Sequence, residues 1–194
     1  MIKVEINVVD DILKSRIALH EFGKPVQKVL HDELLKVNSP TLFLLNLSRV
    51  NPMDYEFVII SFTEIVNESK NNSNVYLVFK IESGEFEELC TGLIDILHLT
   101  IEKGQSEIDI LKQNGFSMIY INEAGHTNYL TNFSDEQMSI LAEIESNDNI
   151  DSMKIQSKFS LTPEDTSAVL NQFVENKFVI RIEGNKYKSV KSFI

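Results

Sequence analysis

Few residues in this sequence have the type and spacing that chemistry requires. The one acidic pair at a junction between an apolar run and a helical pattern is Asp54 with Glu56. Ligands of α/β proteins bind where the carboxyl ends of parallel strands lead into helices, so a pair of carboxylates there could contact a ligand or a partner. We therefore take Asp54 and Glu56 as candidate binding residues. The alternative is that they cap the helix and interact favourably with its dipole.

The other reactive side chains are isolated or belong to a regular helix. The four histidines share no ligand spacing with one another or with Cys90, so no metal site is predicted. Cys90 falls on the apolar stripe of its helix, which predicts a buried, inert thiol. Glu85, Glu87 and Glu88 fit a solvated helix N-terminus better than an acid–base pair. The seven glycines form no phosphate-binding loop. No catalytic residue and no cofactor is therefore predicted.

Composition limits the class of partner. The chain has 194 residues, with 18 Lys and Arg against 29 Asp and Glu, and a formal net charge of −11. A dense basic surface supplies most of the affinity for nucleic acid, so this balance argues against general polyanion binding without excluding a local basic patch. No apolar run approaches the roughly 20 residues of a membrane span, and no secretory signal pattern opens the sequence. With one cysteine there is no intramolecular disulfide, so we expect a cytoplasmic protein.

Strands alternate with helices over the first hundred residues. Apolar patterns predict strands over residues 2–8, 41–47 and 75–79, and helical spacing predicts helices over about 25–38, 54–69 and 85–101. Ser83 or Gly84 is the expected N-cap of the last of these helices. This alternation is typical of a mostly parallel sheet with helices packed on it.

Residues 105–133 give a weaker pattern. Residues 116–121 and 126–130 are separated by turn-forming residues and predict a hairpin. The segment 108–111 fits a strand or a helix equally well.

A different pattern begins at Ser134. Ser134 and Gln137 form a capping box at the start of a predicted helix, and a short helix over about 150–159 follows. Thr162 and Pro163 fit the N-cap and first position of a third helix, and two strands follow over 178–182 and 186–190. We therefore predict two domains, residues 1–133 and residues 134–194.

The second domain resembles the winged helix-turn-helix domains of bacterial regulators. The resemblance is carried by three helices and a hairpin in order, with the segment Leu161-Thr162-Pro163-Glu164 opening the third helix. It implies that the groove-facing positions of a recognition helix are Ser167, Ala168, Asn171 and Gln172. It also implies that Lys186 and Lys188 in the wing contact phosphates.

The charge of this segment departs from that family's pattern. The groove-facing positions carry no Arg or Lys, and Glu164 with Asp165 at the helix start would repel phosphate. Residues 134–194 hold seven basic against ten acidic residues. The alternative is a winged helix that serves protein contact or dimerisation.

The first domain resembles STAS-like modules over about residues 1–103. The segment 42–57 looks like that family's strand, loop and helix start, with Asn46 where its strand usually has Asp and Asp54 matching its helix-start Asp. The resemblance implies a role in protein contact, because the sulfate-transporter and anti-sigma-antagonist members of that family act in this way. The antagonists are switched by phosphorylation of a Ser at this helix start. Here Tyr55 and Glu56 occupy those positions, so the switch is not expected. Phe57 fits the STAS-like proteins of unassigned function.

Together these features predict an α/β protein, with a STAS-like sheet layer carrying helices and a small C-terminal winged-helix (α+β) domain. The leading hypothesis is a non-enzymatic cytoplasmic regulator. Its first domain would receive a protein partner or signal, and its second would bind DNA weakly or as a homodimer. The alternative is an adaptor in which both domains bind proteins. An enzyme with a site at residues 46–57 is a third hypothesis.

Overall fold

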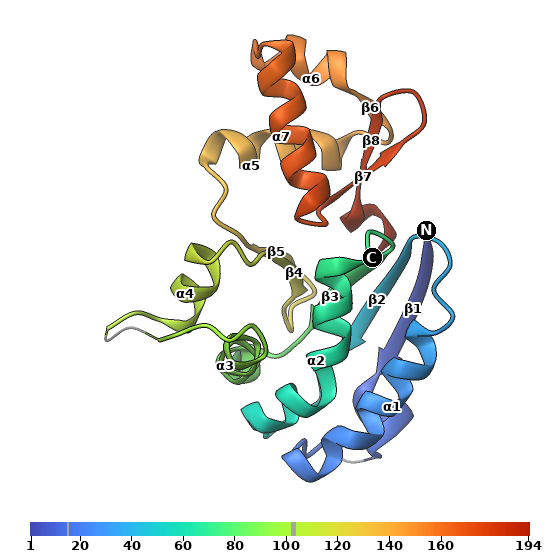
Figure 1. Ribbon diagram of the computed structural model, residues 1–194, viewed down its shortest axis with the longest axis vertical. Helices are drawn as coiled ribbons and strands as arrows, with labels where there is room; N and C mark the ends of the chain where they lie inside the picture. The colour runs from blue at the N-terminus through green and yellow to red at the C-terminus, as the bar shows by residue number, and fades with distance from the viewer. Residues whose placement is uncertain (15, 102–103) are drawn as a thin grey trace. The chain divides into compact units, whose positions relative to one another are not determined.

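The computed structural model describes residues 1–14, 16–101 and 104–194, which divide into two units, Met1–Leu130 and Thr131–Ile194 (Figure 1). The sequence placed the division three residues later, after Phe133. The ring of Phe133 lies 5.0 Å from that of Phe173 and 5.4 Å from that of Phe178. The ring of Phe133 therefore packs on the core of the second unit.

The first unit is built on a five-stranded sheet in the order β1-β2-β3-β4-β5. Its strands are β1 (Ile2–Asn7), β2 (Thr41–Asn46), β3 (Val75–Lys80), β4 (Met118–Ile121) and β5 (Thr127–Leu130). The first four strands are parallel to their neighbours, and β5 returns antiparallel to β4 as the predicted hairpin. The α/β class predicted from the sequence is confirmed.

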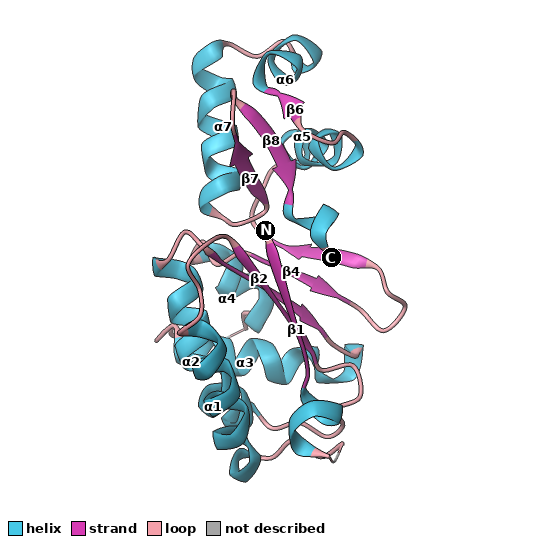
Figure 2. Ribbon diagram, turned by 90° about the vertical axis from the view of Figure 1, so that its right-hand side faces the viewer, coloured by secondary structure: helices cyan, strands magenta, loops and turns pink. Residues whose placement is uncertain are grey.

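The helices of this unit cover one face of the sheet (Figure 2). They are η1 (Val8–Leu13, a π-helix), η2 (His20–Phe22), α1 (Gly23–Leu34), α2 (Tyr55–Asn71), η3 (Ser83–Glu85), α3 (Phe86–Ile96) and α4 (Glu107–Gln113). Parallel neighbours joined in sequence by right-handed crossovers place every connecting helix on the same side. The segment 108–111, undecided from the sequence, is helical, and the side chain of Ser106 caps it.

The core of the unit lies between β2, β3 and α2. Residues Thr41–Leu45 of β2 are all buried, and Phe43 and Leu45 belong to the hydrophobic core shared with the helices. On the helix side, the Phe62 ring packs edge-on against Phe57 at 5.9 Å and Phe79 at 5.5 Å. These aromatic contacts tie α2 to the centre of the sheet.

The start of α3 differs from the sequence prediction. The N-cap position is Glu85, not Ser83 or Gly84, and its side chain makes no capping bond. Glu85 is 8% exposed, and its carboxylate accepts a hydrogen bond of 2.8 Å from the backbone N–H of Met53. The expectation of a solvated Glu85 is therefore wrong, because this carboxylate satisfies a buried donor of a distant segment.

The second unit combines three α-helices with a three-stranded antiparallel sheet in the order β6-β8-β7. Its elements are α5 (Asp135–Ser146), β6 (Ile150–Asp151), α6 (Ser152–Phe159), α7 (Pro163–Glu175), β7 (Val179–Ile182), β8 (Lys186–Ser189) and η4 (Val190–Phe193). The predicted capping box of Ser134 and Gln137 is present, and Thr162 caps α7 with Pro163 in its first turn. These predictions from the sequence are confirmed.

One short strand was not predicted in this unit. Ile150 and Asp151 were expected to be helical, but they form β6 and pair with β8. The side chain of Asp151 then accepts a hydrogen bond from the N–H of Met153 and so caps α6. A two-residue strand has no periodicity of its own, so only its partner strand reveals it.

Because the Phe133 ring packs on two buried rings of the second unit, a fragment of residues 131–194 should unfold cooperatively by itself. A fragment of residues 134–194, which lacks this ring, should be less stable by about 1–3 kcal/mol, the value of two aromatic contacts. Urea denaturation followed by circular dichroism measures both. Equal stability of the two fragments, or no cooperative transition in the longer one, would contradict this division of the chain.

Candidate functional site

The residues predicted to face a DNA groove lie on α7, but they do not share one environment. The core face of this helix consists of Thr166, Val169, Leu170 and Phe173. Ser167, Ala168 and Asn171 point away from it and are exposed. Gln172 is half-buried, and its Oε1 accepts a hydrogen bond of 2.6 Å from Nε2 of Gln137 on α5. Gln172 therefore joins two helices instead of being free to read a base edge.

Gln137 has two structural roles. Its Oε1 accepts a hydrogen bond from the backbone N–H of Ser134, which completes the capping box, while its Nε2 donates to Gln172. The capping box is visible in the sequence because it is local. The bond to Gln172 spans 35 residues and has no signal in the sequence.

The two wing lysines also differ. Lys186, at the start of β8, is exposed. Only 22% of the Lys188 side chain is exposed, and its Nζ lies 2.7 Å from a carboxylate oxygen of Asp148. The same ammonium group lies 4.9 Å from the centre of the Phe193 ring. Its charge is therefore neutralised within the unit, which leaves Lys186 as the predicted wing cation that faces solvent.

Arg181 is a further cation of the wing that the site prediction omitted. It pairs with Tyr187 across β7 and β8, and its guanidinium lies 5.9 Å from the centre of that ring. Its Nη2 also donates a hydrogen bond of 2.8 Å to Oδ1 of Asn185 in the turn. The hairpin predicted from the sequence, with its turn between residues 182 and 186, already places Arg181 opposite Tyr187.

Other lysines of this unit are paired with carboxylates. Lys158 forms an ion pair with Glu143, and Lys191 lies 3.0 Å from Glu145. Burial lowers the pKa of Lys177, which follows α7. Residues 131–194 thus present few unpaired cations on a unit with ten acidic and seven basic residues.

A groove of about 510 Å³ runs between α5 and α7. Its lining residues are Ser134, Glu136, Gln137, Ile140, Leu161, Asp165, Ala168, Val169 and Gln172. Two of the predicted DNA-contacting residues, Ala168 and Gln172, therefore lie in its wall. Its lining includes apolar side chains and two carboxylates, Glu136 and Asp165, and contains no cation.

In the first unit, Asp54 has a structural role at the start of α2. Its Oδ1 accepts a hydrogen bond of 2.6 Å from the N–H of Phe57, and its Oδ2 accepts one of 3.1 Å from the N–H of His20. Both carboxylate oxygens thus bind backbone donors. The capping alternative considered from the sequence accounts for this residue.

Glu56 remains exposed beside a histidine that the sequence did not connect to it. Nδ1 of His20 lies 3.8 Å from Glu56 and 3.6 Å from Asp54. No group of three or more His, Cys, Asp or Glu side chains that could hold a metal ion occurs within residues 1–14, 16–101 and 104–194.

Cys90 lies in the core, as predicted. The side chain is buried, and burial is the main cause that raises the pKa of its thiol to about 12. A thiol with this pKa stays protonated near neutral pH and is a poor nucleophile.

Within residues 1–14, 16–101 and 104–194, no helix has both the length and the apolar character of a membrane span.

Comparison of the chain with protein-family models, with curated proteins and with solved structures gives no match. The functional argument therefore rests on the residues and geometry described above.

The contacts of Asp54 and Phe57 predict unequal effects of substitution at this junction. Phe57→Ala should destabilise the chain by about 3–5 kcal/mol, because its ring is fully buried. Asp54→Asn keeps the acceptor for one backbone N–H but loses the acceptor for the other, and should cost about 1–2 kcal/mol. Glu56→Gln, the exposed control, should change stability by less than about 0.5 kcal/mol. Chemical denaturation measures all three, and a loss above about 3 kcal/mol in Asp54→Asn would show that Asp54 does more than bind these two backbone donors.

Proposed function

We propose that this chain is a non-enzymatic regulatory protein that acts by protein contact. In this proposal the second unit docks a cationic, amphipathic segment of a partner protein in the groove between α5 and α7. The observation that carries the proposal is the lining of that groove, where Glu136 and Asp165 border the apolar side chains of Ile140, Leu161 and Val169. Such a surface favours a partner that presents basic and apolar side chains together.

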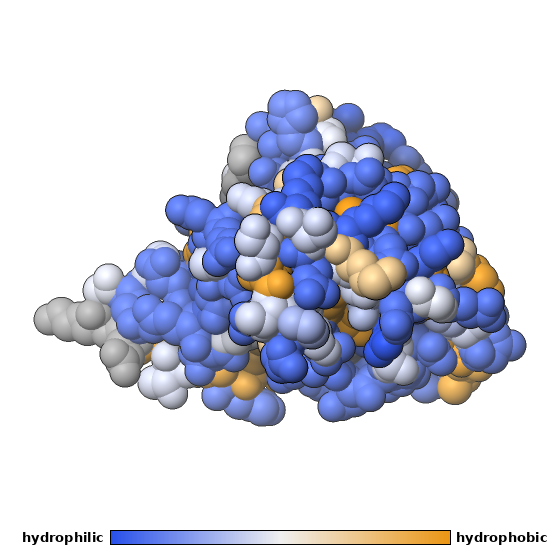
Figure 3. All heavy atoms as spheres, turned by 90° about the horizontal axis from the view of Figure 1, so that it is seen from above, coloured by the Kyte–Doolittle hydropathy of each residue, from blue (hydrophilic) through white to orange (hydrophobic). Residues whose placement is uncertain are grey.

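The charge of the neighbouring surface supports the same partner. The helix face predicted to enter a DNA groove carries no Arg or Lys. Of the two lysines predicted to contact phosphates from the hairpin, Lys188 is bound to Asp148. In the space-filling view, hydrophilic residues cover most of the visible face and hydrophobic residues form small separate patches (Figure 3). Binding through a small apolar patch depends strongly on complementary charge at its rim.

The resemblances seen in the sequence fit this proposal. The second unit has the element order helix, strand, helix, helix and two strands that a winged helix requires. The first unit has the strand and helix order of STAS-like modules, which act by protein contact. We infer that the first unit receives a partner or signal in the cytoplasm, with exposed Glu56 as a candidate contact residue.

DNA binding is the second candidate function. It is favoured by the exposure of Ser167 and Asn171 on α7 and of Lys186 on the wing. These residues offer few positive charges, so affinity for DNA would require a homodimer that doubles the contacts.

The protein-contact proposal is tested with the full chain and a fluorescein-labelled peptide in which Lys and Leu repeat at helical spacing. Glu136→Lys reverses a charge in the groove and should weaken peptide binding roughly tenfold. Glu183→Lys makes the same change in the exposed turn of the wing and should leave affinity within about twofold. Fluorescence anisotropy measures both. Equal weakening by the two variants, or no binding by the unchanged chain, would refute docking in the groove.

DNA binding is tested separately by anisotropy with duplex DNA at about 50 mM salt, where electrostatic attraction is strong. If the protein-contact proposal is right, the chain shows no salt-dependent binding to duplex DNA. If α7 and the wing do bind DNA, Lys186→Ala should lower the salt slope by about one unit, and Asn171→Ala should reduce discrimination between sequences. That pair of results would replace the first proposal by the second.

A further inference from the structure

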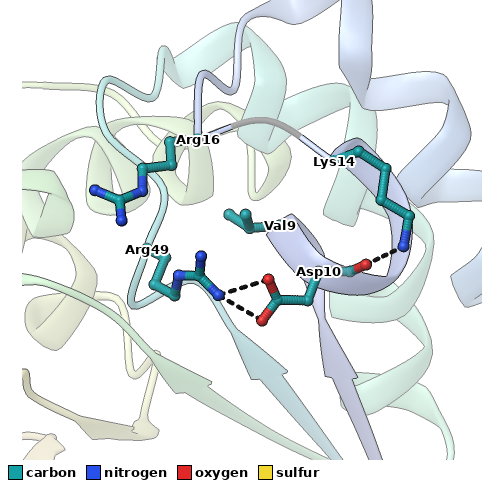
Figure 4. A pocket seen from close by; sticks show the side chains of 5 residues that line it. All are labelled: Val9, Asp10, Lys14, Arg16 and Arg49. Atoms are coloured by element: carbon teal, nitrogen blue, oxygen red, sulfur yellow. Dashed lines mark hydrogen bonds and ion pairs between the residues drawn. The ribbon is translucent and has the colours of Figure 1, made fainter.

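A cationic depression in the first unit belongs to none of the features discussed so far. It is open, encloses about 360 Å³ and is lined by Val9, Asp10, Lys14, Arg16 and Arg49 (Figure 4). Three of these five side chains are basic, although residues 1–130 hold only eleven Lys and Arg against nineteen Asp and Glu. Cations that gather in one place on an acidic unit create a local positive potential.

The parallel sheet determines where this depression lies. β1 ends at Asn7 and the parallel β2 ends at Asn46, so Val9, Asp10 and Arg49 follow the carboxyl ends of neighbouring strands. The depression therefore lies at the carboxyl edge of the parallel strands, where loops present the side chains.

Hydrogen bonds hold the two strand ends together beneath Arg49. Nδ2 of Asn46 donates to Oδ1 of Asn7 at 2.6 Å. The backbone N–H and the hydroxyl of Ser48 both donate to Oδ1 of Asn46, at 3.1 and 2.6 Å. The turn that presents Arg49 is thus organised by side chains from both strands.

The guanidinium of Arg49 already binds a carboxylate of the same unit, that of Asp10. Nη1 of Arg49 lies 2.5 and 2.7 Å from the two carboxylate oxygens of Asp10 (Figure 4). Both side chains are more than half exposed, so water screens this pair and a stronger anion can replace it. Lys14 donates to the backbone carbonyl of Asp10, and within the described part of the chain the Arg16 guanidinium has no partner.

The backbone that carries Asp10 is unusual. Val8–Leu13 forms a π-helix, which ends with Lys14 in the left-handed region at a φ of 57°. π-Helical turns are rare and are frequently found at functional sites. Here the turn brings Asp10 and Lys14 to the same depression.

We propose that this depression binds the phosphate group of a small phosphate monoester, which takes the place of the Asp10 carboxylate on Arg49. A carboxylate offers two oxygens in one plane, and Asp10 shows that Arg49 alone satisfies them. A tetrahedral phosphate dianion carries a further oxygen and a second negative charge. The charged ends of Lys14 and Arg16 point away from Arg49 (Figure 4), and both side chains are exposed, so they can turn toward a phosphate held by Arg49. The volume falls within the range of small-molecule sites. This site is independent of the groove in the second unit.

The test uses the full chain with inorganic phosphate and methyl phosphate as probes, followed by calorimetry and by NMR chemical shifts. Arg49→Gln should weaken binding at least tenfold. Asp10→Asn removes the internal competitor and should tighten it roughly fivefold. Lys28→Gln, which removes an exposed cation outside the depression, is the matched control and should change affinity by less than about twofold.

Acetate serves as the carboxylate comparison and should bind at least tenfold more weakly than phosphate to Asp10→Asn. Circular dichroism confirms that each variant is folded, which is expected because the exchanged side chains are largely exposed. Three results would overturn the proposal: no saturable binding of either phosphate by Asp10→Asn at millimolar concentration, equal weakening by Arg49→Gln and Lys28→Gln, or equal affinity for acetate and phosphate. Absence of saturable binding would mean that the depression does not bind an anion. Equal weakening by the two variants would mean that phosphate only screens the surface charge. Equal affinity for acetate and phosphate would mean that the site does not select phosphate over a carboxylate.

Discussion

The parallel pairing of β1, β2, β3 and β4 in sequence order is the constraint on which the first unit depends. Each connection must cross over the sheet in the right-handed sense, so the helices cover one face and the carboxyl ends of the strands share one edge. The buried run of β2 stabilises this arrangement, because its Phe43 and Leu45 side chains pack in the core with the helices. The polar residues that follow the strands therefore come close together in space, although they are far apart in the sequence. Asp10 and Arg49 line the cationic depression in this way, whereas Asp54 accepts hydrogen bonds from the backbone N–H groups of Phe57 and His20, and Glu85 accepts one from that of Met53.

In the second unit, the distribution of charge determines which partner the fold suits. Its three helices and antiparallel sheet present a helix and a hairpin at the surface, but such an order of elements does not specify DNA as the partner. Several cations that could contact phosphates are paired with carboxylates of the same unit, as Lys188 is with Asp148 and Lys191 with Glu145. The carboxylates of Glu136 and Asp165, by contrast, belong to a groove whose lining contains no cation. This distribution of charge is the basis on which we propose a basic protein segment, and not a polyanion, as the partner.

The sequence predicted most of the fold and only part of the candidate site, for one physical reason. Strands, helices and caps depend on residues within a few positions of one another, so the apolar run of β2, the capping box at Ser134 and the N-cap Thr162 were visible. The contacts that shape the candidate sites join distant segments. The bond between Gln137 and Gln172 and the burial of Glu85 against Met53 depend on how the elements pack, and no periodicity reveals them. The cationic depression was missed for the same reason, because Lys14, Arg16 and Arg49 are isolated in the sequence and meet only at the sheet edge.

The central claim, that the second unit recognises a cationic partner through the groove between α5 and α7, is tested most directly by an NMR shift map of the full chain. The chain, with a mass of 22.2 kDa, is small enough for its backbone and side-chain amides to be followed during titration with the Lys and Leu peptide. The account predicts that the side-chain amides of Gln137 and Gln172 and the backbone amide of Ala168 shift first and saturate together. Shifts confined to Arg181 and Lys186 of the hairpin, induced by duplex DNA and absent with the peptide, would contradict it.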